Sequence, residues 1–359
     1  MDRVSLRDRD GILTREGLIF RVFGYSHPPN AYICDAEYAS AKIFQSTDLR
    51  AVREGKDQLF YKFYNDEGMK LVAKKYPQYL VFHEMLGLKL VGVNKDTIME
   101  AKKPEERLAA LLEAGPTDEL LQATRYVLNI ALENSGLKTQ NFGVFGSMLH
   151  GFYHPKYSDI DFVIYGKAEN AKMRQTLEEL YSQKDSDLSN EFESDDVMKG
   201  KHWLFKNFDV KDFVWHQRRK MIYGLYNDRS ASGRVIKAEF EPVKAWSEIK
   251  SEYDPEARVV QKGWTRIKAR VTNDADAPFI PSIYEIQPLE VLSGSRDALE
   301  AVRVFSYMEE FRQQIRNDET VIVEGNLEEV VSSKSRFHQV TLTYCPRYYE
   351  QVLKVELTT

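Results

Sequence analysis

The most constraining feature of the sequence is a short apolar run that begins with two acidic residues. It reads Asp159-Ile160-Asp161-Phe162 and stays apolar as far as Tyr165. Residues two apart in a β-strand point to the same side of the sheet, so the two aspartates would share one face. The opposite face is apolar, which indicates a buried strand. Unpaired carboxylates are costly to bury, and a divalent cation is the usual way to keep two of them ionised.

A Gly-Ser dipeptide stands shortly before this run. Residues 142–145 predict a strand, Gly146 and Ser147 follow it, and residues 148–158 separate Ser147 from Asp159. Glycine lets the backbone approach a phosphate closely, and free N–H groups at the start of a helix favour an anion. The sequence therefore predicts a phosphate cradle beside a metal site, the two parts that phosphoryl or nucleotidyl transfer needs.

These residues resemble the motif of the polymerase-β-type nucleotidyltransferase superfamily. That motif is a hydrophobic residue, Gly-Ser, a gap of about ten residues, and Asp-hydrophobic-Asp-hydrophobic. Every part of it is present between Phe145 and Phe162. The resemblance implies that Asp159 and Asp161 bind two metal ions and that Gly146 and Ser147 hold the triphosphate of a nucleoside triphosphate. Oxygen ligands favour Mg²⁺, with Mn²⁺ as a substitute.

The resemblance also implies a third carboxylate on a neighbouring strand, which helps to activate the attacking hydroxyl. Residues 235–241 read as a strand with Glu239 and Glu241 on one face. Asp209 and Asp212 are rivals. We favour Glu239 as the third catalytic and metal-binding acid. Without a third acid near the pair, a nucleotide-binding protein that lacks activity would become the better interpretation.

The whole chain also resembles a group of uncharacterised archaeal predicted nucleotidyltransferases. The segments that carry this wider resemblance are 7–10, 16–20, 24–28 and 344–349. It implies no known substrate.

The pattern of the whole chain predicts three domains. Residues 1–115 form a β-rich N-terminal domain, with strands at 17–23 and 31–36 and helices at 59–76 and 104–114. Residues 116–255 form the nucleotidyltransferase domain, with helices at 118–134, 168–182 and 211–226 and strands at 142–145, 159–165 and 235–240. Residues 256–359 form a small β-barrel-like domain, possibly of the oligonucleotide/oligosaccharide-binding type, with strands at 264–271, 283–291, 302–307, 320–323 and 339–344. The predicted fold is thus an α/β (α+β) core with a mixed sheet and a β-rich domain on each side.

Composition limits the environment and the partners. A net charge of −5 argues against a general nucleic-acid coat protein, which is usually basic. Cys34 and Cys345 have no metal-site spacing and fit a reducing cytosol. The most apolar long stretch, 79–93, is too short and too charged to span a bilayer. We expect a cytoplasmic protein without a membrane partner, and the sequence leaves the oligomeric state open.

The expected activity is transfer of a nucleoside monophosphate from a nucleoside triphosphate to an acceptor hydroxyl by a two-metal mechanism. The acceptor could be RNA, protein or a small molecule. The alternative is a catalytically inactive module on the same fold that binds nucleotide or RNA.

Overall fold

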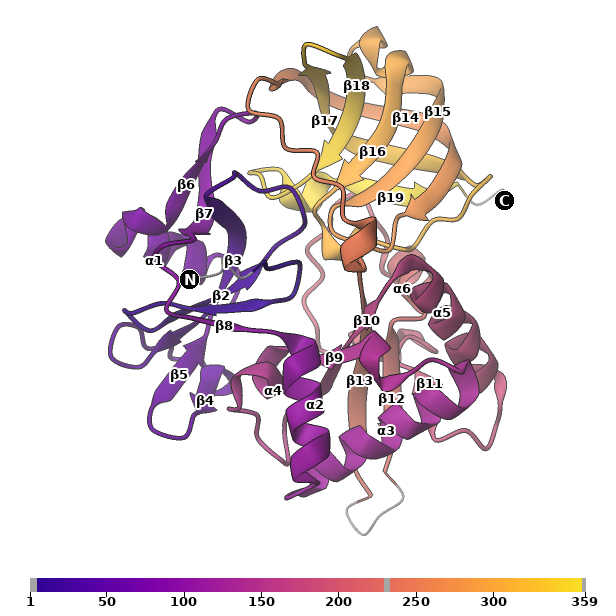
Figure 1. Ribbon diagram of the computed structural model, residues 1–359. Coiled ribbons are helices and arrows are strands. Elements are labelled where there is room, and N and C mark those ends of the chain that lie inside the picture. The colour runs from indigo at the N-terminus through magenta and orange to yellow at the C-terminus, as the bar shows by residue number, and fades with distance from the viewer. Residues whose placement is uncertain (1–4, 229–232, 357–359) are drawn as a thin grey trace. The chain divides into compact units, whose positions relative to one another are not determined.

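The computed structural model describes residues 5–228 and 233–356, and the chain divides into two compact units. The first unit comprises Met1–His83, Leu88–Ser189 and Gly224–Tyr253, and the second comprises Glu84–Gly87, Asn190–Tyr223 and Asp254–Thr359. The described residues form a mixed α+β fold with three sheets and six α-helices (Figure 1). The division into three domains at 115 and 255 stays a prediction.

The N-terminal part of the first unit is built around an eight-stranded sheet. Its main strand order is β4-β5-β3-β2-β1-β8, with β7 pairing to β3 and β6 pairing to β7. The strands are β1 (Gly11–Leu13), β2 (Leu18–Val22), β3 (Ala31–Ser40), β4 (Val52–Glu54), β5 (Leu59–Lys62), β6 (Leu80–His83), β7 (Leu88–Asn94) and β8 (Glu100–Lys102), and helix α1 covers Glu67–Lys75.

The helix expected over 59–76 is therefore wrong in its first part. Leu59–Lys62 is strand β5, which pairs antiparallel with both β3 and β4. Only Glu67–Lys75 is helical. Non-local strand pairing overrides the local helical pattern here, as it often does for short apolar segments.

The rest of the first unit contains a five-stranded mixed sheet in the order β11-β12-β13-β10-β9. Strand β10 is parallel to β13 and antiparallel to β9, and α3 and α5 pack together, with α5 against β10 and β13. The elements are α2 (Pro104–Ala114), α3 (Glu119–Ser135), β9 (Phe142–Val144), α4 (Gly146–His150), β10 (Ile160–Tyr165), α5 (Lys167–Ser182), β11 (Leu188–Asn190), β12 (Tyr223–Asn227) and β13 (Val235–Val243).

Helix α3 leads into this sheet and has clear end signals. Asp118 is its N-cap, because its side chain accepts a hydrogen bond from the backbone N–H of Leu121 at 3.0 Å. Gly136 follows the helix with φ +65°, a left-handed conformation that glycine adopts without strain. The helix expected over 118–134 is thus present, one residue later at each end.

The second unit contains helix α6 (Val210–Arg218) and a sheet of long strands. The strands are β14 (Arg258–Asp276), β15 (Ser282–Ser293), β16 (Ala301–Ser306), β17 (Thr320–Val331), β18 (Arg336–Leu342) and β19 (Val352–Val355). The pairings run β14-β15-β16-β18-β17, and β17 also pairs with β14, so these five strands are linked in a ring. Only the β16–β18 pairing in this ring is parallel. The five strands expected in this region are all present.

The helix expected over 211–226 is shorter in the structure. It ends at Arg218, and Tyr223–Asn227 form strand β12 instead. Met221, between the two elements, has φ +54°, which is incompatible with a continuing right-handed helix.

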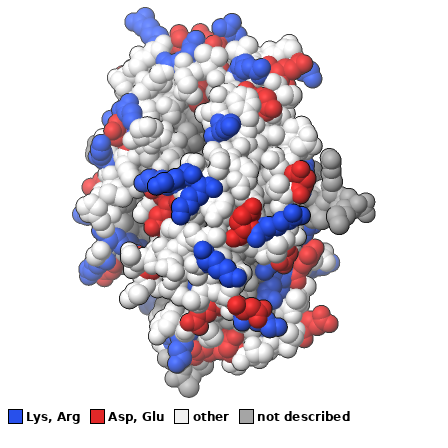
Figure 2. All heavy atoms as spheres, turned by 90° about the vertical axis from the view of Figure 1, so that its left-hand side faces the viewer, with Lys and Arg blue, Asp and Glu red and all other residues white. Residues whose placement is uncertain are grey.

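Among the described residues, no helix is both long enough and apolar enough to cross a membrane. Figure 2 shows Lys and Arg side chains interspersed with Asp and Glu side chains on the face that it presents. Such a mixed surface agrees with the small net charge of −5.

Candidate active site

Two acidic side chains meet on neighbouring parallel strands of the five-stranded sheet. Asp161 on β10 lies directly opposite Glu239 on β13 in the strand register. The residues on either side of Asp161, Ile160 and Phe162, point to the other face of the sheet and are fully buried. Neighbouring strands lie about 4.8 Å apart, so residues in register hold their side chains side by side. Asp159 comes just before β10 and is exposed.

The Gly-Ser turn lies against Asp161. Strand β9 pairs with β10, and the backbone N–H of Phe145 donates to the carbonyl of Asp161 at 3.0 Å. Gly146 follows with φ +60° and begins helix α4. A Cβ atom added at Gly146 would lie 2.5 Å from Oδ2 of Asp161. Any larger residue at 146 would therefore displace this carboxylate. Ser147 is buried beside it.

The electrostatics of Asp161 show that the acidic groups act on one another. Burial raises the pKa of Asp161 well above its ordinary value, and the nearby charges of Glu239 and Asp159 raise it further. Lys62 opposes this shift, and Glu241 adds a smaller contribution that raises the pKa. A cation placed among these groups would lower the cost of keeping them ionised.

Glu239 has a positively charged neighbour on its own strand. Lys237 stands two residues earlier, and its Nζ lies 3.3 Å from Oε1 of Glu239. The described residues contain no group of three or more His, Cys, Asp or Glu side chains already gathered as a metal site. The donors still suit Mg²⁺ in kind, since all are carboxylate oxygens.

The rival third acids have other roles. Glu241 is buried and forms an ion pair of 2.8 Å with the buried Arg9. Asp209 caps α6 by accepting a hydrogen bond from the backbone N–H of Lys211 at 2.7 Å. Asp212 forms an ion pair of 2.8 Å with Lys354. Both aspartates belong to the second unit, whereas Asp161 belongs to the first.

The N-terminal sheet contributes residues that the sequence did not point to. The ring of Tyr38, on β3, lies 4.8 Å from that of Phe152 and 5.7 Å from that of His150, centroid to centroid. These partners stand between the Gly-Ser turn and Asp159. The only local signal was the aromatic residue itself, and aromatic residues are common in strands.

The Arg-Asp-Arg-Asp run near the N-terminus also finds its place at this sheet. Arg9 pairs with Glu241 of β13, and the Arg7 guanidinium lies 3.7 Å from the ring centroid of Tyr165 on β10. Arg7 also pairs with Glu105 at 3.0 Å. This segment therefore joins the N-terminal sheet to the strands that carry the acidic residues.

Comparison with known proteins agrees with the motif. Residues 125–216 match the family model of the nucleotidyltransferase domain, and this match includes Gly146, Ser147, Asp159 and Asp161 but ends before Glu239. The uncharacterized protein MJ1086 of Methanocaldococcus jannaschii is 28% identical over 358 residues, which cover 98% of this chain and 100% of that protein. No solved structure matches the chain significantly. The resemblance to nucleotidyltransferases is thus confirmed for residues 125–216, and the wider resemblance to an uncharacterised archaeal protein extends over nearly the whole chain.

Proposed function

We propose that this protein transfers a nucleoside monophosphate from a nucleoside triphosphate to an acceptor hydroxyl. The observation that carries the proposal is the position of Asp161, which lies opposite Glu239 on a parallel strand and against the α-carbon of Gly146. A nucleotidyltransferase requires acidic metal ligands beside a backbone turn that admits phosphate. The family match over residues 125–216 supports a general role in nucleotidyl transfer.

In this proposal Asp159, Asp161 and Glu239 would hold two Mg²⁺ ions, or Mn²⁺ in their place. When bound, such ions lower the pKa of an attacking hydroxyl and stabilise the charge of the leaving pyrophosphate. Gly146, whose missing side chain leaves room for the Asp161 carboxylate, would present its backbone to the substrate phosphates, and Ser147 would supply a hydroxyl close to them. The acceptor oxygen forms a bond to the α-phosphorus, the bond to the bridging oxygen breaks, and pyrophosphate leaves. Glu239 takes up the proton of the acceptor hydroxyl.

A binding module without activity is not favoured. Such a module has no physical need for mutually repelling carboxylates. They are costly, since burial and like charges raise the pKa of Asp161 and so oppose its ionisation. Proteins tolerate such groups where a reaction uses them.

The second unit would select the acceptor, either RNA or protein. Its five-strand ring, with a single parallel pairing between β16 and β18, supports a small closed barrel of the oligonucleotide/oligosaccharide-binding kind. A cavity of about 450 Å³ in this unit is suited in size to a small ligand or a single nucleotide unit, and it is lined by Lys262, Asp297, Glu300, Val302, Glu329, Arg336, Phe337 and His338.

The proposal is tested with the full chain, each of the four labelled nucleoside triphosphates, Mg²⁺ and total cellular RNA or protein. We expect label transfer and pyrophosphate release by the wild type. Asp161→Asn should reduce transfer by at least about a hundredfold, because it removes a charge that acts in the transition state. Asp57→Asn, at an exposed turn of the N-terminal sheet, is the matched control and should leave transfer unchanged.

Circular dichroism and thermal unfolding would show whether both variants are folded. If the folded Asp161→Asn variant transferred the nucleotide at the wild-type rate, Asp161 would not be a metal ligand in the reaction. Binding of nucleotide by the wild type without any transfer would instead support the inactive module.

A further inference from the structure

The edge of the N-terminal sheet carries two cations on the face that meets the catalytic segment. In the strand register Lys62 of β5 lies opposite Tyr38 of β3, and Arg53 of β4 lies opposite Phe60 of β5. Directly opposed residues in an antiparallel pair point to the same side of the sheet. All four side chains therefore share one face.

That face packs against the segment between the Gly-Ser turn and the acidic pair. Tyr38 and Phe60 form a buried cluster with Ile19 and with Phe152, which follows helix α4. The Tyr38 and Phe152 rings are 4.8 Å apart between centroids. Lys62 and Arg53 are thus carried by the same face that contacts the link from Ser147 to Asp159.

The same face also reaches the helix that begins at the Gly-Ser turn. Tyr38, which lies opposite Lys62 in the strand register, has its ring centroid 5.7 Å from that of His150, the last residue of α4. Burial and the charge of Glu37 raise the pKa of Tyr38; Arg53 lowers it and Asp161 raises it, so both of these charges lie near the phenol. This places positive charge close to the acidic cluster.

Neither cation forms an ion pair or hydrogen bond with a carboxylate within residues 5–228 and 233–356, although the charge of Lys62 lowers the pKa of nearby Glu37. Lys62 is partly buried, and its Nζ lies 6.0 Å from the ring centroid of Tyr64. Arg53 is also partly buried and donates from Nη1 to the carbonyls of Arg50 and Val52, at 2.6 and 2.8 Å. Partly buried cations without an anionic partner are costly, and a bound anion would compensate them.

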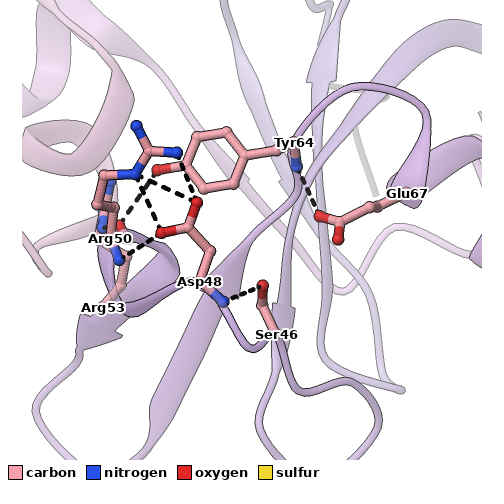
Figure 3. A network of polar contacts seen from close by, with 6 residues as sticks. All are labelled: Ser46, Asp48, Arg50, Arg53, Tyr64 and Glu67. Atoms are coloured by element: carbon pink, nitrogen blue, oxygen red, sulfur yellow. Dashed lines mark hydrogen bonds and ion pairs between the residues drawn. The ribbon is translucent and has the colours of Figure 1, made fainter.

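A polar network holds this edge of the sheet in place (Figure 3). The Asp48 carboxylate accepts hydrogen bonds from Nε and Nη2 of Arg50, at 3.0 and 2.6 Å. The Tyr64 hydroxyl donates to the carbonyl of Arg50 at 3.2 Å. The nearby acid is therefore engaged by Arg50, and Arg53 remains available for an external anion.

From this arrangement we infer that Lys62 and Arg53 bind the phosphates of the nucleoside triphosphate, so that the N-terminal sheet forms a second wall of the active site. This inference rests on the proposed function. The ligand chemistry is a polyphosphate, since lysine binds phosphate as a point charge and arginine as a planar fork of donors.

The test measures binding of each nucleoside triphosphate, of inorganic tripolyphosphate and of the matching nucleosides to the full chain, together with the KM and kcat of transfer. The variants are Lys62→Gln, Arg53→Gln and the double substitution, with Lys62→Arg as the conservative change. Lys56→Gln is the matched control, because Lys56 is exposed in the turn of the same β4–β5 hairpin.

We expect Lys62→Gln to weaken binding of triphosphate and tripolyphosphate about tenfold, the factor that corresponds to 1.4 kcal/mol. The double variant should be weaker still, Lys62→Arg should keep most of the affinity, and nucleoside binding should not change. KM should rise more than kcat falls. Lys56→Gln should match the wild type.

The outcomes separate this inference from the proposed function. Wild-type transfer with an unchanged KM in the folded double variant would overturn the polyphosphate site and leave the function standing. Lys62-dependent binding of tripolyphosphate by a wild type that transfers nothing would keep the anion site and reject the function. A wild type that binds neither triphosphate nor tripolyphosphate would overturn both.

Discussion

Glu239 and Glu241 stand on the same face of the same strand, one pleat apart, yet their surroundings differ. Glu241 meets Arg9, a buried side chain from the N-terminal segment, at 2.8 Å. Glu239 instead lies opposite Asp161, and its cationic partner Lys237 is about a third exposed. Glu241 has a compensating positive charge within the core, whereas Glu239 lies beside a second carboxylate.

We interpret this difference as one between a structural carboxylate, Glu241, and a proposed metal-binding carboxylate, Glu239. A buried ion pair with a fixed partner holds two segments together and leaves little capacity for a ligand. Two repelling carboxylates on neighbouring strands beside a glycine turn are unfavourable for the protein alone, and a bound cation would relieve this repulsion. Substituting the positively charged side chain that pairs with each glutamate, Arg9 or Lys237, tests this contrast.

The largest effect is expected at the built-in pair. Arg9→Met would leave Glu241 buried without its arginine, and breaking a buried pair from one side costs about 3–5 kcal/mol of unfolding free energy. Urea unfolding of the variant measures this loss. A second substitution, Glu241→Gln, should restore part of the stability in the Arg9→Met background. A loss below about 1 kcal/mol would show that the pair is not structural.

An intermediate effect is expected from a third kind of ionisable group, a buried histidine whose partners are both backbone atoms. His216 donates from Nδ1 to the carbonyl of Asp212 at 2.6 Å, and its Nε2 accepts from the N–H of Val355 at 3.0 Å. Burial lowers the pKa of His216 from 6.5 to about 4. The imidazole is therefore neutral in the folded protein.

Because the pKa of His216 is lower in the folded protein than in the unfolded chain, the stability should fall as the pH falls. As the pH falls below 6.5 the unfolded chain takes up a proton at His216, whereas the folded chain does so only near pH 4. Stability should decline over this window, by about 3 kcal/mol from this residue. Unfolding free energies at pH 4 and pH 7 should differ less in His216→Gln than in the wild type. An equal difference in both would contradict the assignment, whatever the absolute stability of the variant.

Strand β10, which carries the proposed metal ligand Asp161, was predictable because its signal is local. Alternation of acidic and apolar residues places Asp159 and Asp161 on one face before any partner strand is known, and the structure has Ile160 and Phe162 buried on the other. Glu239 was favoured among four acids, but sequence could not separate it from Glu241, since both share a face. That distinction depends on Arg9, which is more than two hundred residues away along the chain.

The position of the proposed phosphate-binding cations could not be predicted, because it depends on strand pairing. Lys62 reads locally as part of a helix, and only its pairing with Tyr38 of β3 places it on the face that packs against Phe152. The N-terminal arginines were visible as a motif, but nothing near them in sequence indicated that they would reach β10 and β13. The local sequence pattern carries no information about contacts between distant segments of the chain.

The smallest change in stability is expected at the exposed counterpart of the Arg9 pair. Lys237→Met removes the cation beside Glu239, yet the Lys237 side chain is 36% exposed and the pair is open to solvent on one side. Partly exposed pairs contribute little, so the unfolding free energy should change by less than about 0.5 kcal/mol.

The function should respond more than the fold, because the Lys237 cation would no longer compete with a metal ion for Glu239. If Glu239 is the third metal ligand, half-maximal transfer should need less Mg²⁺ in Lys237→Met than in the wild type, and a titration of activity against Mg²⁺ measures this. An unchanged Mg²⁺ requirement would remove Glu239 from the metal site, while a loss of stability as large as that of Arg9→Met would erase the contrast between the two glutamates.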